Sequence, residues 1–227
     1  MFVRLTADRT SPHKTLRDLG LASGSNSTVF FSEFTYKKGT EIFGEKEPAD
    51  YVYRVKNGAV RSYKLLTDGR RQIGAFHLEG DIFGMSSGEF HRFTAEAIVD
   101  TTVWLTKRQS LEGVAQVDRS LAHHVLSMTT RSLQHAENHM LLLGRKDALE
   151  RVAAFLVEMD TRLADAGVMA LPMSRRDIAD YLGLTLETVS RSLSRLRRSG
   201  ALSFGGNSQR EITILDRKQL VSLDMQG

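Results

Sequence analysis

The chain has 227 residues, a formal net charge of +4 and no cysteine. Its length suits one large domain or two smaller ones, and its composition is that of a globular protein. The absence of cysteine excludes disulfides, cysteine-ligated zinc or iron–sulfur clusters, and a cysteine nucleophile. The first six residues do not begin an apolar signal segment, and no run of 18 apolar residues occurs. We therefore expect a cytoplasmic protein that does not cross a membrane.

The first half of the chain has the rhythm of an antiparallel β domain. Short segments rich in β-branched and aromatic residues, at 29–31, 51–55, 59–63 and 101–105, predict strands. Residues 66–70 predict a hairpin turn between two of them. Turn glycines recur through this region, at Gly39, Gly44, Gly58, Gly69, Gly74, Gly80, Gly84 and Gly88. This spacing is typical of a sandwich or barrel.

A long helix is predicted from Asp118 to Leu143, where the apolar residues recur at intervals of three and four. Gly144 is expected to end it. The apolar face is wide enough to pack against both the β domain and an identical helix in a dimer. A helix buried within one domain is the alternative. The sequence also does not show which part of the wide apolar face would contact the partner helix. The dimerisation candidates are Leu121, Val125, Met128, Leu133, His135, Met140 and Leu142.

A helix-turn-helix pattern follows a further predicted helix, which runs from Lys146 to about Ala166. Ser174 with Asp177 forms a capping pattern for a first short helix, and Gly183 supplies a tight turn. Thr185 then caps a second helix, whose buried side we expect at Leu186, Val189, Leu193 and Leu196. The small Ala179, the turn glycine and the core valine stand at the offsets of a helix-turn-helix.

The outward side of the second helix has the chemistry of a DNA-recognition helix. Arg191 can pair with guanine, Glu187 can accept from cytosine and Ser190 can meet a thymine edge. The predicted phosphate contacts are Thr185, Thr188, Ser194, Arg195, Arg198 and Arg175. Residues 170–210 hold seven arginines and three acids, an excess equal to the net charge of the whole chain. The alternative is the solvated face of an ordinary helical hairpin.

The segments that follow predict the wing of a winged helix. Residues 201–204 and 211–215 flank Gly205-Gly206-Asn207 as a β-hairpin, and residues 216–223 suit a short final helix.

From about Phe31 to Leu215 the sequence resembles the Crp–Fnr family of bacterial transcription regulators. Residues Glu187 to Arg191 match the E-x-x-S-R signature of its Fnr side. The resemblance implies an α+β fold with an N-terminal antiparallel β-roll, a cyclic-nucleotide-binding-like jelly roll, over residues 1–117. A long dimerisation helix over 118–144 and a C-terminal winged helix-turn-helix over 145–227 would follow. It also implies a homodimer that binds double-stranded DNA at TTGAT-type palindromes and recruits RNA polymerase.

The sensor region departs from the better-known relatives, and no cofactor is expected. The chain lacks the cysteines of oxygen-sensing members. Where cyclic-nucleotide-binding relatives carry a phosphate cassette, Met85 replaces the glutamate, and either His91 or, with the alignment shifted by one, Arg92 falls at the place of the arginine. The stretch from Tyr51 to Ile73, which includes residues 65–73, is similar to the FixK-like branch, whose members regulate micro-oxic, denitrification or nitrogen-fixation genes.

Several alternatives stay open beside an activator of this kind. The β-roll could gate the same DNA domain by binding haem, through His77, His91 or His124, or by binding another small ligand. His135 and His139 have the spacing of a metal pair on one helix face, although polar packing at a dimer seam accounts for them as well. The chain could also be a β-roll binding protein whose helical tail is a partner module. No catalytic constellation is apparent, so we do not expect an enzyme.

Overall fold

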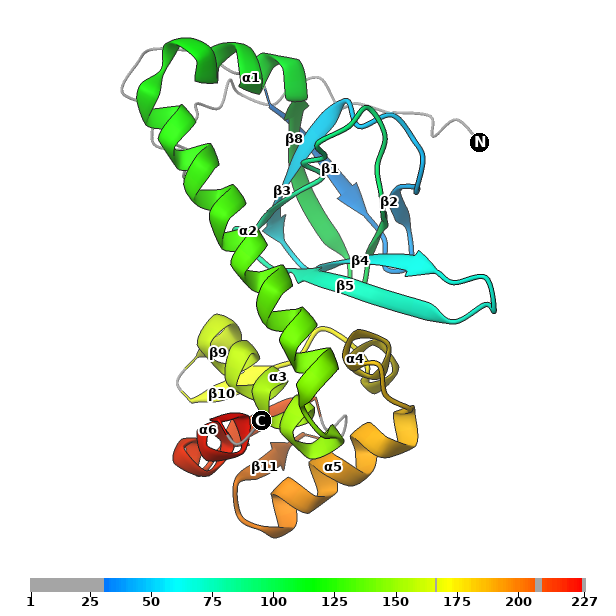
Figure 1. The fold of residues 1–227 in the computed structure, drawn as a ribbon, viewed down its shortest axis with the longest axis vertical. Coiled ribbons are helices and arrows are strands. Elements are labelled where there is room, and N and C mark those ends of the chain that lie inside the picture. The colour runs from blue at the N-terminus through cyan, green and yellow to red at the C-terminus, as the bar shows by residue number, and fades with distance from the viewer. Residues whose placement is uncertain (1–30, 166, 207–209, 226–227) are drawn as a thin grey trace. The chain divides into compact units, whose positions relative to one another are not determined.

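A computed structural model describes residues 31–165, 167–206 and 210–225. Contacts divide them into two units. One comprises residues 31–64 and 74–132, and the other comprises residues 65–73 and 133–225. The helix α2 (Arg119–Arg145) contributes to both units (Figure 1). The strand expected at 29–31 falls mostly outside the described residues.

The first unit is built on two antiparallel four-stranded sheets, which confirms the predicted β-roll. One has the strand order β1-β8-β3-β6 and the other has the order β2-β7-β4-β5. The strands are β1 (Ser32–Tyr36), β2 (Glu41–Phe43), β3 (Tyr51–Asn57), β4 (Val60–Leu65), β5 (Arg71–His77), β6 (Ile82–Phe83), β7 (Thr94–Ala97) and β8 (Thr101–Lys107).

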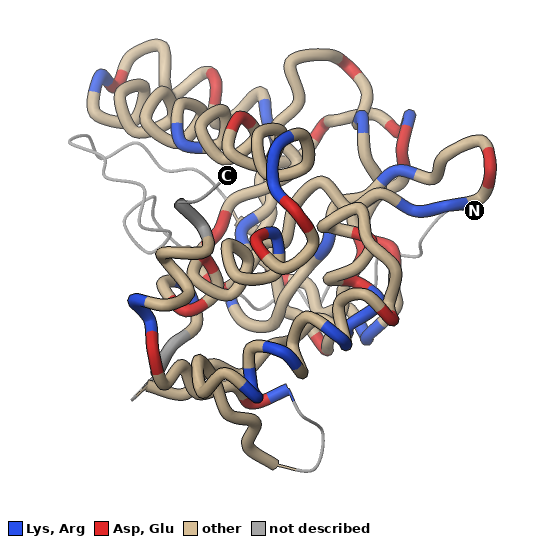
Figure 2. The backbone as a smooth tube through the Cα atoms, turned by 60° about the horizontal axis from the view of Figure 1, so that its bottom comes forward, with Lys and Arg blue, Asp and Glu red and all other residues tan. Residues whose placement is uncertain are grey.

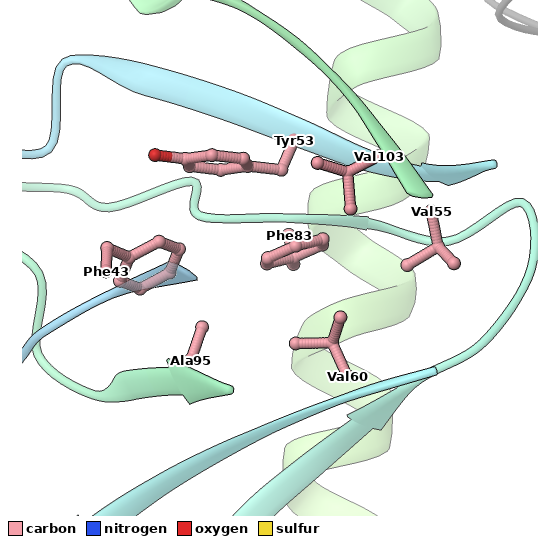
Figure 3. Packing of buried hydrophobic residues seen from close by; sticks show 7 residues of the cluster. All are labelled: Phe43, Tyr53, Val55, Val60, Phe83, Ala95 and Val103. Atoms are coloured by element: carbon pink, nitrogen blue, oxygen red, sulfur yellow. The ribbon is translucent and has the colours of Figure 1, made fainter. Parts of the chain in front are cut away.

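Aromatic rings and small aliphatic side chains fill the interior of the β-roll (Figure 3). The ring of Tyr53 lies 5.2 Å from those of both Phe43 and Phe83, centroid to centroid. Gly84 follows Phe83 in the chain and has a φ of +82°. A Cβ at this position would lie 2.6 Å from the Tyr53 ring. Glycine is therefore needed at this position both for its backbone conformation and for the close approach of the ring.

A helix that the sequence analysis did not predict, α1 (Arg108–Val117), closes one end of the β-roll. Its N-cap, Lys107, makes no side-chain capping bond, so the usual start signal is missing. Leu111 of α1 and Leu121 of α2 share a buried cluster with Val52. Between the helices, Asp118 Oδ1 accepts from the backbone N–H of residues 120 and 121 and so starts α2.

The boundaries of the next two helices differ from the prediction. Gly144 does not end α2, which continues to Arg145 because an exposed helical glycine weakens a helix without breaking it. The following helix, α3 (Ala148–Leu163), stops before Ala166. It gives way to a short hairpin of β9 (Ala164–Asp165) and β10 (Val168–Ala170), which the sequence analysis missed.

The rest of the second unit is the predicted winged helix-turn-helix. It consists of α4 (Arg175–Leu182), α5 (Leu186–Arg198), β11 (Leu202–Gly205), β12 (Glu211–Ile214) and α6 (Arg217–Met225). The strands form a sheet in the order β11-β12-β10-β9. Buried residues of α3, among them Leu156 and Met159, face the core beneath the helix-turn-helix. None of the described helices is long and apolar enough to cross a membrane.

Candidate nucleic-acid interface

Helix α4 begins with the capping box that the sequence predicted. Ser174 Oγ accepts from the backbone N–H of Asp177 at 3.2 Å, and Asp177 Oδ2 accepts from the backbone N–H of Ser174 at 2.9 Å. Two otherwise unsatisfied donors at the helix start are thereby paired. Asp177 is an effective substitute for the more usual glutamate.

The turn between α4 and α5 depends on Gly183, which adopts the left-handed conformation at φ +63°. Its backbone N–H donates to the carbonyl of Ala179 and closes the end of α4. The chain then enters α5 through Thr185, whose Oγ1 accepts from the backbone N–H of Thr188 at 3.2 Å. Local hydrogen bonds and one glycine therefore set the angle between α4 and α5.

Burial separates the two sides of α5. Its inward side consists of Val189, Ser192, Leu193 and Leu196, all of them buried. Glu187 and Arg191 are exposed one turn apart, and Ser190 between them is half-buried. The three predicted base-reading residues therefore share the outward side of the first two turns, while basic residues recur farther along the helix (Figure 2).

The carboxylate of Glu187 is held in its ionised form. Its pKa lies below the ordinary value, mainly because the carboxylate accepts hydrogen bonds from its own backbone N–H and from the Thr185 hydroxyl. The nearby Arg176 and Arg191 lower this pKa further. An ionised carboxylate can only accept hydrogen bonds, which is the chemistry that an amino group on a base edge requires.

The predicted phosphate contacts occupy different environments. Arg195 and Arg198 are exposed on the last turns of α5, and Ser194 is half-buried. The hydroxyls of Thr185 and Thr188 lie 3.0 Å apart at the helix start. Arg175 is directed elsewhere, because its Nη1 lies 3.4 Å from Ser190 Oγ.

Three residues near this surface were not singled out from the sequence. Exposed Arg176 lies close enough to Glu187 to affect its pKa. Phe204, on β11, has the guanidinium groups of Arg175 and Arg197 at 5.6 and 5.9 Å from its ring centroid. The excess of arginine in this segment was visible in the sequence, but the aromatic platform that holds two of them was not.

The structure divides the predicted dimerisation residues of α2. Leu121 is fully buried and belongs to the core of its own protomer, whereas Val125 and Met128 pack against its cluster but are only half-buried. Leu142 is also buried. Leu133 and Met140 are 58% and 66% exposed and remain available to a partner.

The two histidines of α2 also contact residues of their own chain. His139 Nε2 lies 2.9 Å from the carbonyl oxygen of Tyr181, and the two rings stack at 4.1 Å. His135 Nδ1 lies 3.8 Å from Glu158, and its Nε2 lies 3.4 Å from the Tyr181 hydroxyl. His135 therefore takes part in a polar cluster that joins α2 to α3 and α4, and its side chain stays 35% exposed. No group of three metal-ligating side chains occurs within the described part of the chain.

The histidines of the β-roll contact its interior. The His91 ring stacks on Phe43 with centroids 3.6 Å apart, and burial lowers the pKa of His91. His77 Nε2 lies 2.8 Å from Ser62 Oγ. Met85 is partly exposed on the loop after β6, where Arg108 donates to the carbonyls of residues 86 and 88.

Comparisons with known protein families recover both parts of this architecture. Residues 33–118 match the cyclic nucleotide-binding domain. Residues 150–223 match the Crp-like helix-turn-helix domain. A β-roll of this type followed by such a helix-turn-helix defines a class of DNA-binding transcription regulators.

Individual relatives narrow the class. The chain is 42% identical to the nitrogen fixation regulation protein FixK of Rhizobium meliloti over 189 residues, which are 83% of this chain and 85% of the relative. It is 44% identical to FixK of Azorhizobium caulinodans, over 83% and 77% of the two chains. The solved structure of FixK2 from Bradyrhizobium japonicum is 62% identical, with a TM-score of 0.84 over 88% of this chain and all of that one. The chain belongs to the Crp–Fnr family of transcription regulators, in its FixK-like branch.

Proposed function

We propose that the protein is a homodimeric transcription activator that binds TTGAT-type palindromes. It would regulate micro-oxic or anaerobic, denitrification or nitrogen-fixation genes, and the names of the FixK relatives, nitrogen fixation regulation proteins, support the last of these. One observation carries the proposal: Glu187, Ser190 and Arg191 lie together on the outward side of α5. The start of this helix is fixed by the capping hydroxyl of Thr185.

The proposed base contacts follow from the chemistry of these side chains. Arg191 is exposed and can donate two parallel hydrogen bonds to guanine O6 and N7, the most common specific contact in the major groove. Glu187, ionised, can accept from the cytosine amino group. Ser190 lies between them and faces a neighbouring base pair. Arg195 and Arg198 then meet phosphates, which bind without reading the sequence.

A dimer would place two such helices on one face of the DNA. Leu126, Leu133 and Met140 are 63%, 58% and 66% exposed and stand seven residues apart. A seven-residue repeat of exposed apolar side chains is the pattern of a two-helix seam, with a spacing of about 10.5 Å along the axis. We therefore assign the seam to this stripe, which keeps Leu133 and Met140 from the set predicted from the sequence and adds Leu126.

We further propose that DNA binding needs neither a cyclic nucleotide nor an iron–sulfur cluster. At the place of the family's phosphate-binding arginine this chain has His91, whose pKa is lowered by burial, and Met85 stands in place of the glutamate. Tyr53 and Phe83 fill the adjoining core. Gating by haem or another small ligand remains the alternative, and an absorbance spectrum of the purified protein tests it by the presence of a Soret band.

The experiment that tests the base-reading assignment compares two arginines of one helix. Arg191→Ala should weaken binding to the palindromic duplex by about 1–3 kcal/mol per half-site and relax selectivity at one guanine. Arg195→Ala should weaken binding to palindromic and random duplexes alike and reduce the slope of log K against log salt by about one. An equal loss on both duplexes for Arg191→Ala would refute its role in base reading.

The remaining steps have their own tests. The wild-type protein should retard a TTGAT-type duplex at moderate salt without added ligand. A failure to retard it would favour a helical module that binds another partner. As an activator the dimer would also recruit RNA polymerase, and transcription in vitro from a promoter with this palindrome should rise when the protein is added.

A further inference from the structure

Arg175 contacts the reading helix, although its place in the sequence suggested a phosphate contact. It is the first residue of α4, and the capping box at Ser174 fixes the backbone there. Its Nη1 donates to Ser190 Oγ at 3.4 Å, and both side chains are half-buried. The guanidinium therefore contacts Ser190, which lies on α5 between the proposed base-reading residues Glu187 and Arg191.

A second contact fixes the orientation of this guanidinium. Its central carbon lies 5.6 Å from the ring centroid of Phe204 on the wing strand β11. Arginine is favourably placed over an aromatic face at this distance. One side chain thus joins the start of α4, the middle of α5 and the wing, and its direction is set by an aromatic ring as well as by a hydrogen bond.

The donor and acceptor chemistry of this contact has a consequence for base selection. A guanidinium can only donate hydrogen bonds, so Ser190 Oγ must accept from it. The serine hydroxyl makes no other hydrogen bond with the residues that the structure describes. Its own proton is then left to donate, and the major-groove acceptors that it can meet are thymine O4 and guanine O6 or N7. Accepting from Arg175 occupies one of the two lone pairs of the hydroxyl oxygen, so a base acceptor is favoured over the amino groups of adenine and cytosine.

We infer that Arg175 is a positioning residue that makes Ser190 a hydrogen-bond donor toward the DNA, and so adds selectivity for an acceptor on the base edge. This inference rests on the proposed function, because it assumes that α5 enters the major groove. It replaces the earlier assignment of Arg175 to a phosphate. At 3.4 Å the contact is long for a hydrogen bond, so the expected effect on selectivity is a factor of about three to ten.

The test measures selectivity at each thymine of the half-site. Binding is compared between duplexes that carry thymine and duplexes that carry 5-methylcytosine, which keeps the methyl group but replaces the O4 acceptor with an amino donor. At one thymine, both Arg175→Ala and Ser190→Ala should reduce the preference for thymine about three- to tenfold. The double variant should lose no more than either single variant. Arg175→Lys should also lose it, because a lysine keeps the charge without the planar fork.

Lys218→Ala is the control, since Lys218 is an exposed cation on α6 with no assigned part in DNA binding. It should leave the thymine preference unchanged. If Arg175→Ala instead weakens all duplexes equally and lowers the salt slope by about one, the residue is a phosphate contact and the inference is overturned. Additive losses in the double variant would overturn it as well.

A measurement without DNA separates this inference from the proposed function. Thermal unfolding of the same two single variants and their double variant forms a cycle that reports the coupling of Arg175 to Ser190 directly. Failure of the wild type to bind the palindrome would refute the proposed function while the cycle still shows the coupling. Independent effects on the melting temperature would refute the contact itself.

Discussion

Substitution of one leucine on α2 tests the proposed dimer seam. Leu133 lies at the centre of the exposed stripe, between Leu126 and Met140, and is 58% exposed in its own protomer. Leu133→Ala should therefore weaken dimerisation while leaving the folded protomer nearly as stable as before.

The size of the effect follows from the exposed fraction of Leu133. Complete burial of a leucine stabilises by about 1.5–3 kcal/mol. Because 58% of Leu133 is exposed in the protomer, a dimer can bury somewhat more than half of that amount on each side. Symmetry doubles the loss to about 2–3 kcal/mol, which corresponds to a dimer dissociation constant raised ~30- to 150-fold.

Sedimentation equilibrium without DNA measures this constant over a range of protein concentrations. Leu65→Ala is the matched control, because Leu65 is 66% exposed but belongs to the end of β4 and not to α2. The reasoning would be refuted if Leu133→Ala left the dissociation constant unchanged, or if Leu65→Ala raised it by as much.

Four further substitutions test the fold. Leu121→Ala should lower the free energy of unfolding by about 2–5 kcal/mol in urea, because Leu121 is fully buried within the protomer. Gly183→Ala should lower it by about 1–2 kcal/mol because of the positive φ, whereas Gly144→Ala, at an exposed helical position with open space for a Cβ, should raise it by about 1 kcal/mol. Burial lowers the pKa of His91, so below its ordinary value of about 6.5 the unfolded chain binds more protons and stability falls as pH falls. His91→Phe keeps a ring against Phe43 and should flatten the decline of the melting temperature between pH 8 and 5; an unchanged decline would contradict this.

The helix-turn-helix could be predicted almost to the residue because its determinants are local. The capping serine, the turn glycine at 183 and the capping threonine each act within three or four residues along the chain. The same holds for the wing, whose strands follow α5 directly. Short-range hydrogen bonds and backbone preferences are written into the sequence next to the structures that they form.

The sequence could not show which apolar residues of α2 pack into the protomer's own core and which stay exposed, because both sets recur with the same helical period. Leu121 became a core residue through Val52, 69 positions earlier in the chain, and no local pattern reveals such a partner. The contact of Arg175 with Ser190 and Phe204 is of the same kind. Helix α1 escaped prediction for a different reason, since its amphipathic pattern begins without a capping side chain.

The ends of α2 and α4 meet at Arg151 of α3. Its guanidinium donates to the carbonyl of Leu143 in the last turn of α2, to that of Lys146 just after this helix, and to that of Leu182 at the end of α4, each at 2.9–3.0 Å. One planar cation therefore pairs carbonyls at two helix ends that the helices leave without internal partners. The turn at Gly183 thus starts from a helix end that is hydrogen-bonded to the preceding helices of the same unit.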